Sequence, residues 1–195
     1  MKTLVMLTLV LAVSVMTGCA TDQELVKTAS VSARGDVFQE VAEEGPIPRG
    51  YADLLIVASL KTHKPYKYEK KSHGTADFKI LINIDGQAGW MEACLKEENI
   101  EPRGLRDPEA GEGMRYIFRK HLRLKAGTHK VIVAIPEDVL AVERVINLKE
   151  GSANDIILEP VYGLASARRR PATFTETSYL KGIKWFRMIL NGKPI

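Results

Sequence analysis

One segment of the sequence concentrates side chains that could bind an anion. Residues 61–73 read KTHKPYKYEKKSH, with five lysines, two histidines, two tyrosines and a single acid. Cations beside aromatic faces suit sugar phosphates, anionic lipid headgroups or single-stranded nucleic acid. The alternative interpretation is a solvated, charged hairpin loop that binds nothing. The candidate binding residues are Lys61, His63, Lys64, Tyr66, Lys67, Tyr68, Lys70, Lys71 and His73.

The sequence lacks the residue patterns of familiar catalytic and metal sites. The histidines are His63, His73, His121 and His129. None of them follows the spacing of metal ligands. Acidic pairs such as Glu97 with Glu98 lie in the charged stretch 96–113, which is interrupted by Gly and Pro and predicts a solvated loop. No nucleophile elbow or phosphate-binding loop occurs, so we expect no enzyme activity, no cofactor and no metal.

A cysteine near the N-terminus is the second candidate for chemistry. One charge, Lys2, precedes an uncharged and largely apolar run from Thr3 to Gly18, and Cys19 follows. A short charged start, an apolar stretch and small residues form the pattern of a secretory signal peptide. As a helix this run would span about 24 Å at ~1.5 Å per residue. That is shorter than the ~30 Å hydrocarbon core of a bilayer, so we do not expect a permanent span.

The end of that run, Val15-Met16-Thr17-Gly18-Cys19, resembles the lipobox of bacterial lipoproteins. The resemblance implies a diacylglycerol thioether on Cys19, cleavage between Gly18 and Cys19, and acylation of the new N-terminus. Met16 departs from the family, where leucine is commoner. Two alternatives remain, which are cleavage after Ala20 and an uncleaved anchor. Because Ala20 and not aspartate follows the cysteine, the resemblance also implies an outer-membrane location facing the periplasm.

Length and composition fit one globular domain with appendages. The chain has 195 residues, 45% of them hydrophobic, and two cysteines, which cannot build a disulfide scaffold. We expect a signal peptide over residues 1–18, a lipidated N-terminus and flexible tether over 19–50, and a β-sandwich domain over 51–195. A short helix could form within Gly35–Glu44. The second cysteine, Cys94, is expected to be buried and inert.

The mature chain is rich in predicted strands. Short β-branched and apolar runs are separated by turn signals such as Asp85-Gly86 and Glu150-Gly151. This pattern predicts an all-β, immunoglobulin-like antiparallel sandwich. The predicted strands are Asp53–Leu60, Phe78–Ile84, Tyr116–Phe118, Leu122–Leu124, Thr128–Ile135, Arg144–Leu148, Asp155–Leu158 and Ile183–Leu190.

Residues 78–159 resemble the PEGA-type and related immunoglobulin-like domains of bacterial envelope proteins. The matching pieces are 82–87 (INIDGQ), 122–131 (LRLKAGTHKV), 145–151 (VINLKEG) and 156–158 (IIL). About 35 residues, 88–121, intervene where the family has few. The resemblance implies a binding or structural module without a common active site.

These observations predict a membrane-anchored envelope lipoprotein that acts as a structural or protein-interaction module. The alternative function is an envelope module that binds anionic glycan or lipid through residues 61–73. The expected partners are the membrane, through the lipid anchor, and envelope proteins, peptidoglycan or lipopolysaccharide. We expect no nucleic-acid partner.

Overall fold

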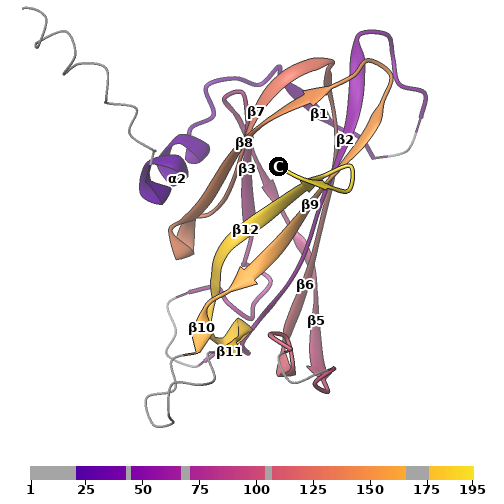
Figure 1. Ribbon diagram of the computed structural model, residues 1–195. Coiled ribbons are helices and arrows are strands. Elements are labelled where there is room, and N and C mark those ends of the chain that lie inside the picture. The colour runs from indigo at the N-terminus through magenta and orange to yellow at the C-terminus, as the bar shows by residue number, and fades with distance from the viewer. Residues whose placement is uncertain (1–20, 43–44, 67–70, 104–106, 166–175) are drawn as a thin grey trace, which may run out of the picture.

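The computed structural model describes residues 21–42, 45–66, 71–103, 107–165 and 176–195, which form a sandwich of two β-sheets (Figure 1). The predicted signal peptide and Cys19 lie outside the described residues, as do Lys67, Tyr68 and Lys70.

The larger sheet has seven strands in the order β1-β6-β2-β9-β12-β13, with β5 also paired to β6. Its strands are β1 (Phe38–Glu40), β2 (Tyr51–Thr62), β5 (Ala93–Ile100), β6 (Gly111–Lys125), β9 (Ala153–Tyr162), β12 (Ile183–Leu190) and β13 (Lys193–Pro194). Strand β6 pairs with β2 along one edge and with both β1 and β5 along the other.

The smaller sheet has four strands in the order β4-β3-β7-β8. They are β3 (Ile80–Ile84), β4 (Gln87–Met91), β7 (Gly127–Ile135) and β8 (Leu140–Leu148). A separate pair joins β10 (Leu164–Ala165) to β11 (Glu176–Thr177), and two 3-10 turns span Pro136–Asp138 (η2) and Tyr179–Lys181 (η3).

The core lies between the two sheets, where alternate side chains of each strand meet. In β6, Phe118 and Leu122 are fully buried, whereas Ile117 and Arg119 are exposed on the other face. Successive side chains of a strand point to opposite faces, so one face of β6 faces the core and the other faces solvent. Burying a large apolar side chain contributes about 1.5–3 kcal/mol, so this inner layer is the main source of stability.

The predicted all-β sandwich is confirmed. Every described strand pair is antiparallel except β2 with β9, which run parallel. The predicted strands Tyr116–Phe118 and Leu122–Leu124 are parts of one strand, β6, because residues 119–121 continue the same alternation. The predicted solvated loop 96–113 was wrong at both ends, where β5 and β6 pair from Glu98↔Gly113 to Ile100↔Gly111.

The expected flexible tether is largely folded, so that prediction is corrected. Helix α2 (Asp22–Ser30) begins with a capping box, in which Thr21 and Glu24 satisfy each other's backbone N–H groups. Its Ala29 is buried against the smaller sheet. The short helix expected within Gly35–Glu44 is replaced by a bend and by β1, which pairs with β6. None of the helices in the described ranges is long and apolar enough to cross a membrane.

Candidate functional site

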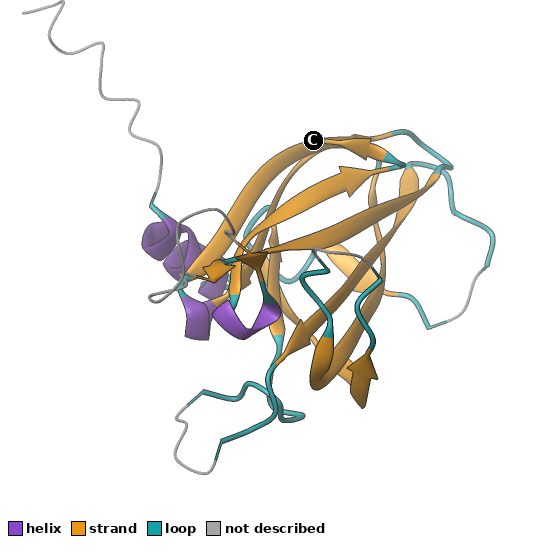
Figure 2. Cartoon of the chain, turned by 60° about the horizontal axis from the view of Figure 1, so that its bottom comes forward, coloured by secondary structure: helices purple, strands orange, loops and turns teal. Residues whose placement is uncertain are grey.

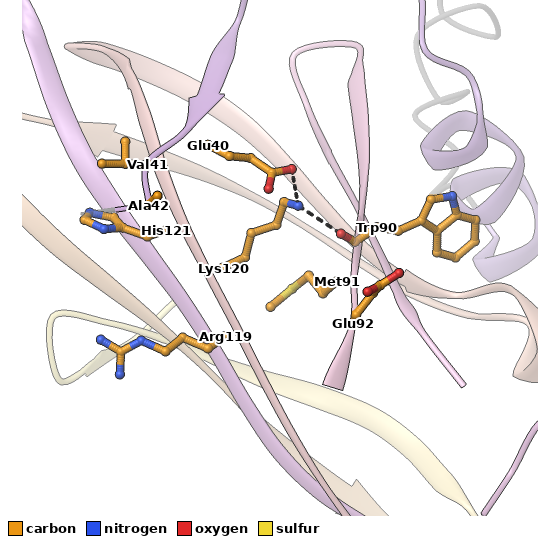
Figure 3. Close-up of a pocket in the computed structure, with 9 residues that line it drawn as sticks. All are labelled: Glu40, Val41, Ala42, Trp90, Met91, Glu92, Arg119, Lys120 and His121. Carbon is orange, nitrogen blue, oxygen red and sulfur yellow. Dashed lines mark hydrogen bonds and ion pairs between the residues drawn. The ribbon is translucent and has the colours of Figure 1, made fainter. Parts of the chain in front are cut away.

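The larger sheet has a gap along one edge of strand β6. On this edge β5 covers Gly111–Phe118 and β1 covers Leu122–Leu124, and the Val41 N–H donates to the His121 carbonyl at 3.0 Å, which leaves residues 119 and 120 between them. A hollow of about 530 Å³ opens at the gap, within the size range of small-ligand sites. We call this hollow the edge notch. It is lined by Glu40, Val41, Ala42, Trp90, Met91, Glu92, Arg119, Lys120 and His121 (Figure 3).

Lys120 lies at the centre of the edge notch. Its Nζ donates to the Glu40 carboxylate and, at 2.9 Å, to the backbone carbonyl of Trp90 (Figure 3). On the same rim, Lys79 lies 2.8 Å from Glu92, and this hydrogen bond lowers the pKa of the Glu92 carboxyl. Because these charges are matched in pairs, the notch presents fixed polar groups and little net charge.

Arg119 is a cation of the edge notch that has no hydrogen-bond or ion-pair partner among the described residues. Its side chain points away from Lys120 (Figure 3), and it also borders a second hollow of about 420 Å³. A guanidinium group binds carboxylate and phosphate through paired hydrogen bonds. The two hollows can therefore hold a polar or anionic group through hydrogen bonds and charge.

Asp53, which lines the second hollow, forms a partly buried ion pair with Arg123 that joins β2 to β6. Arg123 donates to the two carboxylate oxygens of Asp53 at 2.7 and 2.9 Å, and His121 Nε2 lies 3.5 Å from the same group. Asp53 and Arg123 are directly opposite each other in the ladder. The hydrogen bond from Arg123 lowers the pKa of the Asp53 carboxyl. We interpret this ion pair as a contact that stabilises the pairing of β2 with β6.

Replacing Asp53 with asparagine should lower stability at pH 7 by roughly 1–3 kcal/mol, because Arg123 loses a charged partner. The lowered pKa of Asp53 means that its contribution is present above the unfolded-state value of about 3.9 and is lost as pH falls through the folded-state pKa. When the free energy of unfolding is measured with urea from pH 7 to pH 3, it should fall less steeply with decreasing pH in the variant than in the wild type.

Asp36→Asn is the matched control, because Asp36 also pairs with an arginine but its side chain is 73% exposed, against 6% for Asp53. An exposed pair contributes about 0–1 kcal/mol. Equal losses of unfolding free energy in the two variants would contradict a stabilising role for the Asp53–Arg123 ion pair.

The basic segment 61–73 is divided between the interior and the surface. Lys61 is fully buried on β2, and its Nζ donates to the carbonyls of Glu109 at 2.8 Å and Gly111 at 2.5 Å. It also lies 4.9 Å from the centre of the Tyr179 ring. Burial lowers the pKa of the Lys61 amino group. Lys61 was predicted as an anion-binding residue, but it is an internal support that no ligand can reach.

Two more lysines of the segment are neutralised by acids from other strands and turns. Lys64 Nζ contacts Glu97 and lies 2.6 Å from Glu112. Lys71 lies 2.7 Å from Asp138. These pairs involve residues 33 to 67 positions away in the chain, so the charges of Lys64 and Lys71 are offset by acids that are distant in the sequence.

His73 is buried and lies 3.0 Å from the same Asp138 carboxylate that holds Lys71. Burial alone would raise the pKa of Asp138, but the hydrogen bonds with His73 and Lys71 outweigh it and the pKa is lowered. Tyr66 is 65% exposed, and the centre of its ring lies 5.1 Å from that of His63, with the two rings tilted by 33°.

A hollow of about 360 Å³ brings part of the segment together. It is lined by Thr62, His63, Lys71, His73, Asp138, Tyr179, Leu180, Lys181, Gly182 and Ile183. Its cations come from two distant parts of the chain, and Asp138 offsets part of their charge. We call it the η3 hollow, after the turn that closes it.

The acids considered for catalysis take part in ion pairs. Arg115 holds Glu98 at 2.9 Å and Glu109 at 2.7 Å, whereas Glu97 and Glu112 hold Lys64. The ring nitrogen Nδ1 of His129 lies 2.7 Å from the Asp85 carboxylate. Among the described residues no group of three or more His, Cys, Asp or Glu side chains could hold a metal ion.

Sequence reasoning missed the edge notch and the exposure of Cys94. Cys94 lies opposite Ile117 on the outer face of the larger sheet and is exposed, so its predicted burial was wrong. It falls on the outward face of an edge strand, which its apolar neighbours in sequence did not indicate. Arg119 carried no local motif, because the notch is formed by segments about 30 and 80 residues away.

Comparison with known proteins gives no relative. No protein-family model, no curated protein and no solved structure matches this chain.

Proposed function

We propose that this protein is a lipid-anchored bacterial envelope lipoprotein whose β-sandwich acts as a structural or protein-interaction module. Its anchor would be on Cys19, and its location the outer membrane, facing the periplasm. The proposal includes no enzymatic activity, cofactor or metal.

The observation that carries this proposal is the position of Cys19 at the border between two kinds of sequence. The uncharged run before it ends in the lipobox-like residues Val15–Cys19, and the helix α2 follows with its N-cap at Thr21. Each buried CH₂ group of a lipid contributes about 0.8 kcal/mol, and one chain alone binds only marginally. Several acyl chains on one cysteine would hold the folded part durably at a membrane.

An interaction role is supported by the outer face of the larger sheet. Ile117 on β6, Ile157 on β9 and Trp185 on β12 are each at least 42% exposed and point outward. Val57 on β2 lies directly between Ile157 and Arg119 in the ladder. Exposed aromatic and aliphatic side chains set among polar ones are typical of surfaces where proteins bind one another. The partner that fits is another envelope protein.

One observation favours the alternative, binding of an anionic glycan or lipid. The η3 hollow contains His63, Lys71 and His73 of the predicted segment together with Lys181. If this function is correct, lipopolysaccharide or peptidoglycan should bind the chain in a salt-sensitive way. Changing Lys64, Lys67, Lys70 and Lys71 to glutamate should abolish that binding. No binding at low salt would remove the alternative.

Cys19→Ala tests the main proposal. The variant should lose incorporation of labelled fatty acid and move from the membrane fraction to the soluble fraction, because the thiol that carries the lipid is gone. Cys94→Ala is the matched control, since the chain has two cysteines, and it should keep both label and membrane attachment. Membrane retention of Cys19→Ala at the level of the control would contradict the proposal.

A further inference from the structure

The layers of the fold place the chain next to Cys19 on one side of the sandwich. Helix α2 packs on the outer face of the smaller sheet, where Leu25, Val26 and Ala29 contact Leu81 and Ile132 (Figures 1 and 2). The core and the larger sheet lie beyond it. The order across the molecule is therefore α2, smaller sheet, larger sheet, and the outer face of the larger sheet is the side opposite α2.

The chain between Cys19 and α2 is too short to lift the fold away from its anchor. Asp22 follows Cys19 by three positions, and a fully extended chain spans at most about 3.6 Å per position, or about 11 Å in total. Stacked β-sheets are themselves about 10 Å apart. An anchor on Cys19 thus reaches the α2 side of the molecule and cannot reach the opposite face.

Helix α2 is held firmly to the sheet, so it cannot serve as an extension of the linker. The buried Asn83 amide donates to the carbonyls of Ala29 at 3.2 Å and Val31 at 3.0 Å. Past the helix, the N–H of Ala33 donates to the carbonyl of Gly86 at 2.9 Å. Detaching α2 would leave the Asn83 side chain without these partners and uncover Leu81, which costs free energy.

The same face exposes the side chains that suit a membrane interface. Trp90 is directly opposite Leu81 in the ladder and is therefore on the α2 side, with half of its surface exposed. Val145, opposite Lys130, and Val31, just after α2, are more than 60% exposed. Tryptophan is enriched at the headgroup level of membranes, where its ring is partly apolar and its N–H stays hydrated.

The charges on this face are balanced. Lys79 pairs with Glu92 at 2.8 Å, and Lys130 pairs with Glu143 at 3.3 Å. The first turn of α2 is acidic, with Asp22 and Glu24, and Lys27 is in its last turn. Attraction to anionic lipid therefore does not orient the molecule. The short linker and the exposed apolar side chains do.

We infer that the α2 face of the smaller sheet lies against the membrane that holds the anchor, with Trp90 in the headgroup region. This inference rests on the proposed lipidation of Cys19. The outer face of the larger sheet, with Ile117, Ile157 and Trp185, then points away from that membrane and stays accessible to a partner in the aqueous compartment.

The two tryptophans of the chain provide the test, because they lie on opposite outer faces. Trp185→Phe leaves Trp90 as the single fluorophore, and Trp90→Phe leaves Trp185. Each lipidated variant is reconstituted into phosphatidylcholine–phosphatidylglycerol vesicles that contain a lipid with a nitroxide on its headgroup. We expect several-fold stronger quenching of Trp90 than of Trp185. Equal quenching, or stronger quenching of Trp185, would overturn the orientation.

Mass spectrometry of the purified protein separates this inference from the proposed function. Absence of acyl chains on Cys19 would refute the lipoprotein proposal, whereas an acylated protein without selective quenching would refute the orientation alone. Inserting twenty Gly and Ser residues between Ala20 and Thr21 gives the linker a reach of about 25 Å and keeps the N-cap. Quenching of Trp90 should then fall toward that of Trp185, and unchanged selectivity would refute the role of the short linker.

Discussion

Replacing Lys61 with alanine is expected to lower the free energy of unfolding by about 3–5 kcal/mol, because two hydrogen bonds from a charged donor are lost, at roughly 1.5–3 kcal/mol each. The variant leaves the buried carbonyls of Glu109 and Gly111 without their donor and opens a cavity against Tyr179. Equilibrium urea unfolding of the chain beginning at Ala20 measures this loss.

Lys71→Ala is the control for this prediction, because Lys71 belongs to the same basic segment but its side chain is 47% exposed. We expect it to cost less than Lys61→Ala, because the Lys71 amino group is partly exposed and Asp138 keeps its contact with His73. Lys61→Met, which keeps most of the volume, should fall between the two. If Lys61→Ala kept wild-type stability and weakened binding to an anionic glycan, Lys61 would be a ligand residue and its structural role would be wrong.

Local pattern was sufficient for the strands because burial repeats every second residue within them. In Thr128–Ile135 and Ile183–Leu190 the predicted and observed strands agree within one residue. Glycines at turns are also local signals. Gly86 has a φ of 91° after the β3 strand, a conformation that other residues rarely adopt, and it was predicted as a turn.

Contacts between distant segments could not be predicted in this way. The residues of the segment 61–73 were interpreted together because they are adjacent in sequence. In the structure Lys61, at the end of β2, is buried, whereas Tyr66, beyond the strand, is exposed to solvent. The folding of α2 was missed for a similar reason. Its capping box is visible in the sequence as Thr21 and Glu24, but its apolar residues are few and become buried only against the smaller sheet.

The edge notch depends on an even less local property, the place where two strands end. β1 stops at Glu40 and β5 starts at Ala93, and both strands pair with β6. The gap between them exists because these two ends do not meet. The sequence predicted two short strands, Tyr116–Phe118 and Leu122–Leu124, where the structure has the single strand β6, and it held no sign that β6 lacks a partner strand on one edge between them. The Arg119 guanidinium lines both hollows because of where β1 and β5 end along β6, which is a property of the strand arrangement.

Gly113→Ala is expected to be about as damaging as the loss of Lys61, at roughly 3 kcal/mol or more. Gly113 is buried in β6, and an added Cβ would lie 2.5 Å from the carbonyl oxygen of Thr62 and 2.8 Å from the Lys61 Cε. The carbonyl belongs to the backbone of β2, so the ladder between the two strands must separate to admit one methyl group. The midpoint of urea unfolding should fall accordingly.

Gly35→Ala is the matched control, because an added Cβ there meets nothing within 4 Å. That variant should change stability by less than about 0.5 kcal/mol, as surface substitutions do. The comparison isolates close packing from the general effect of replacing a glycine. If both variants unfolded at the same urea concentration, β2 and β6 would have to be farther apart at Gly113, and the Lys61 side chain would no longer be enclosed between β6 and Tyr179.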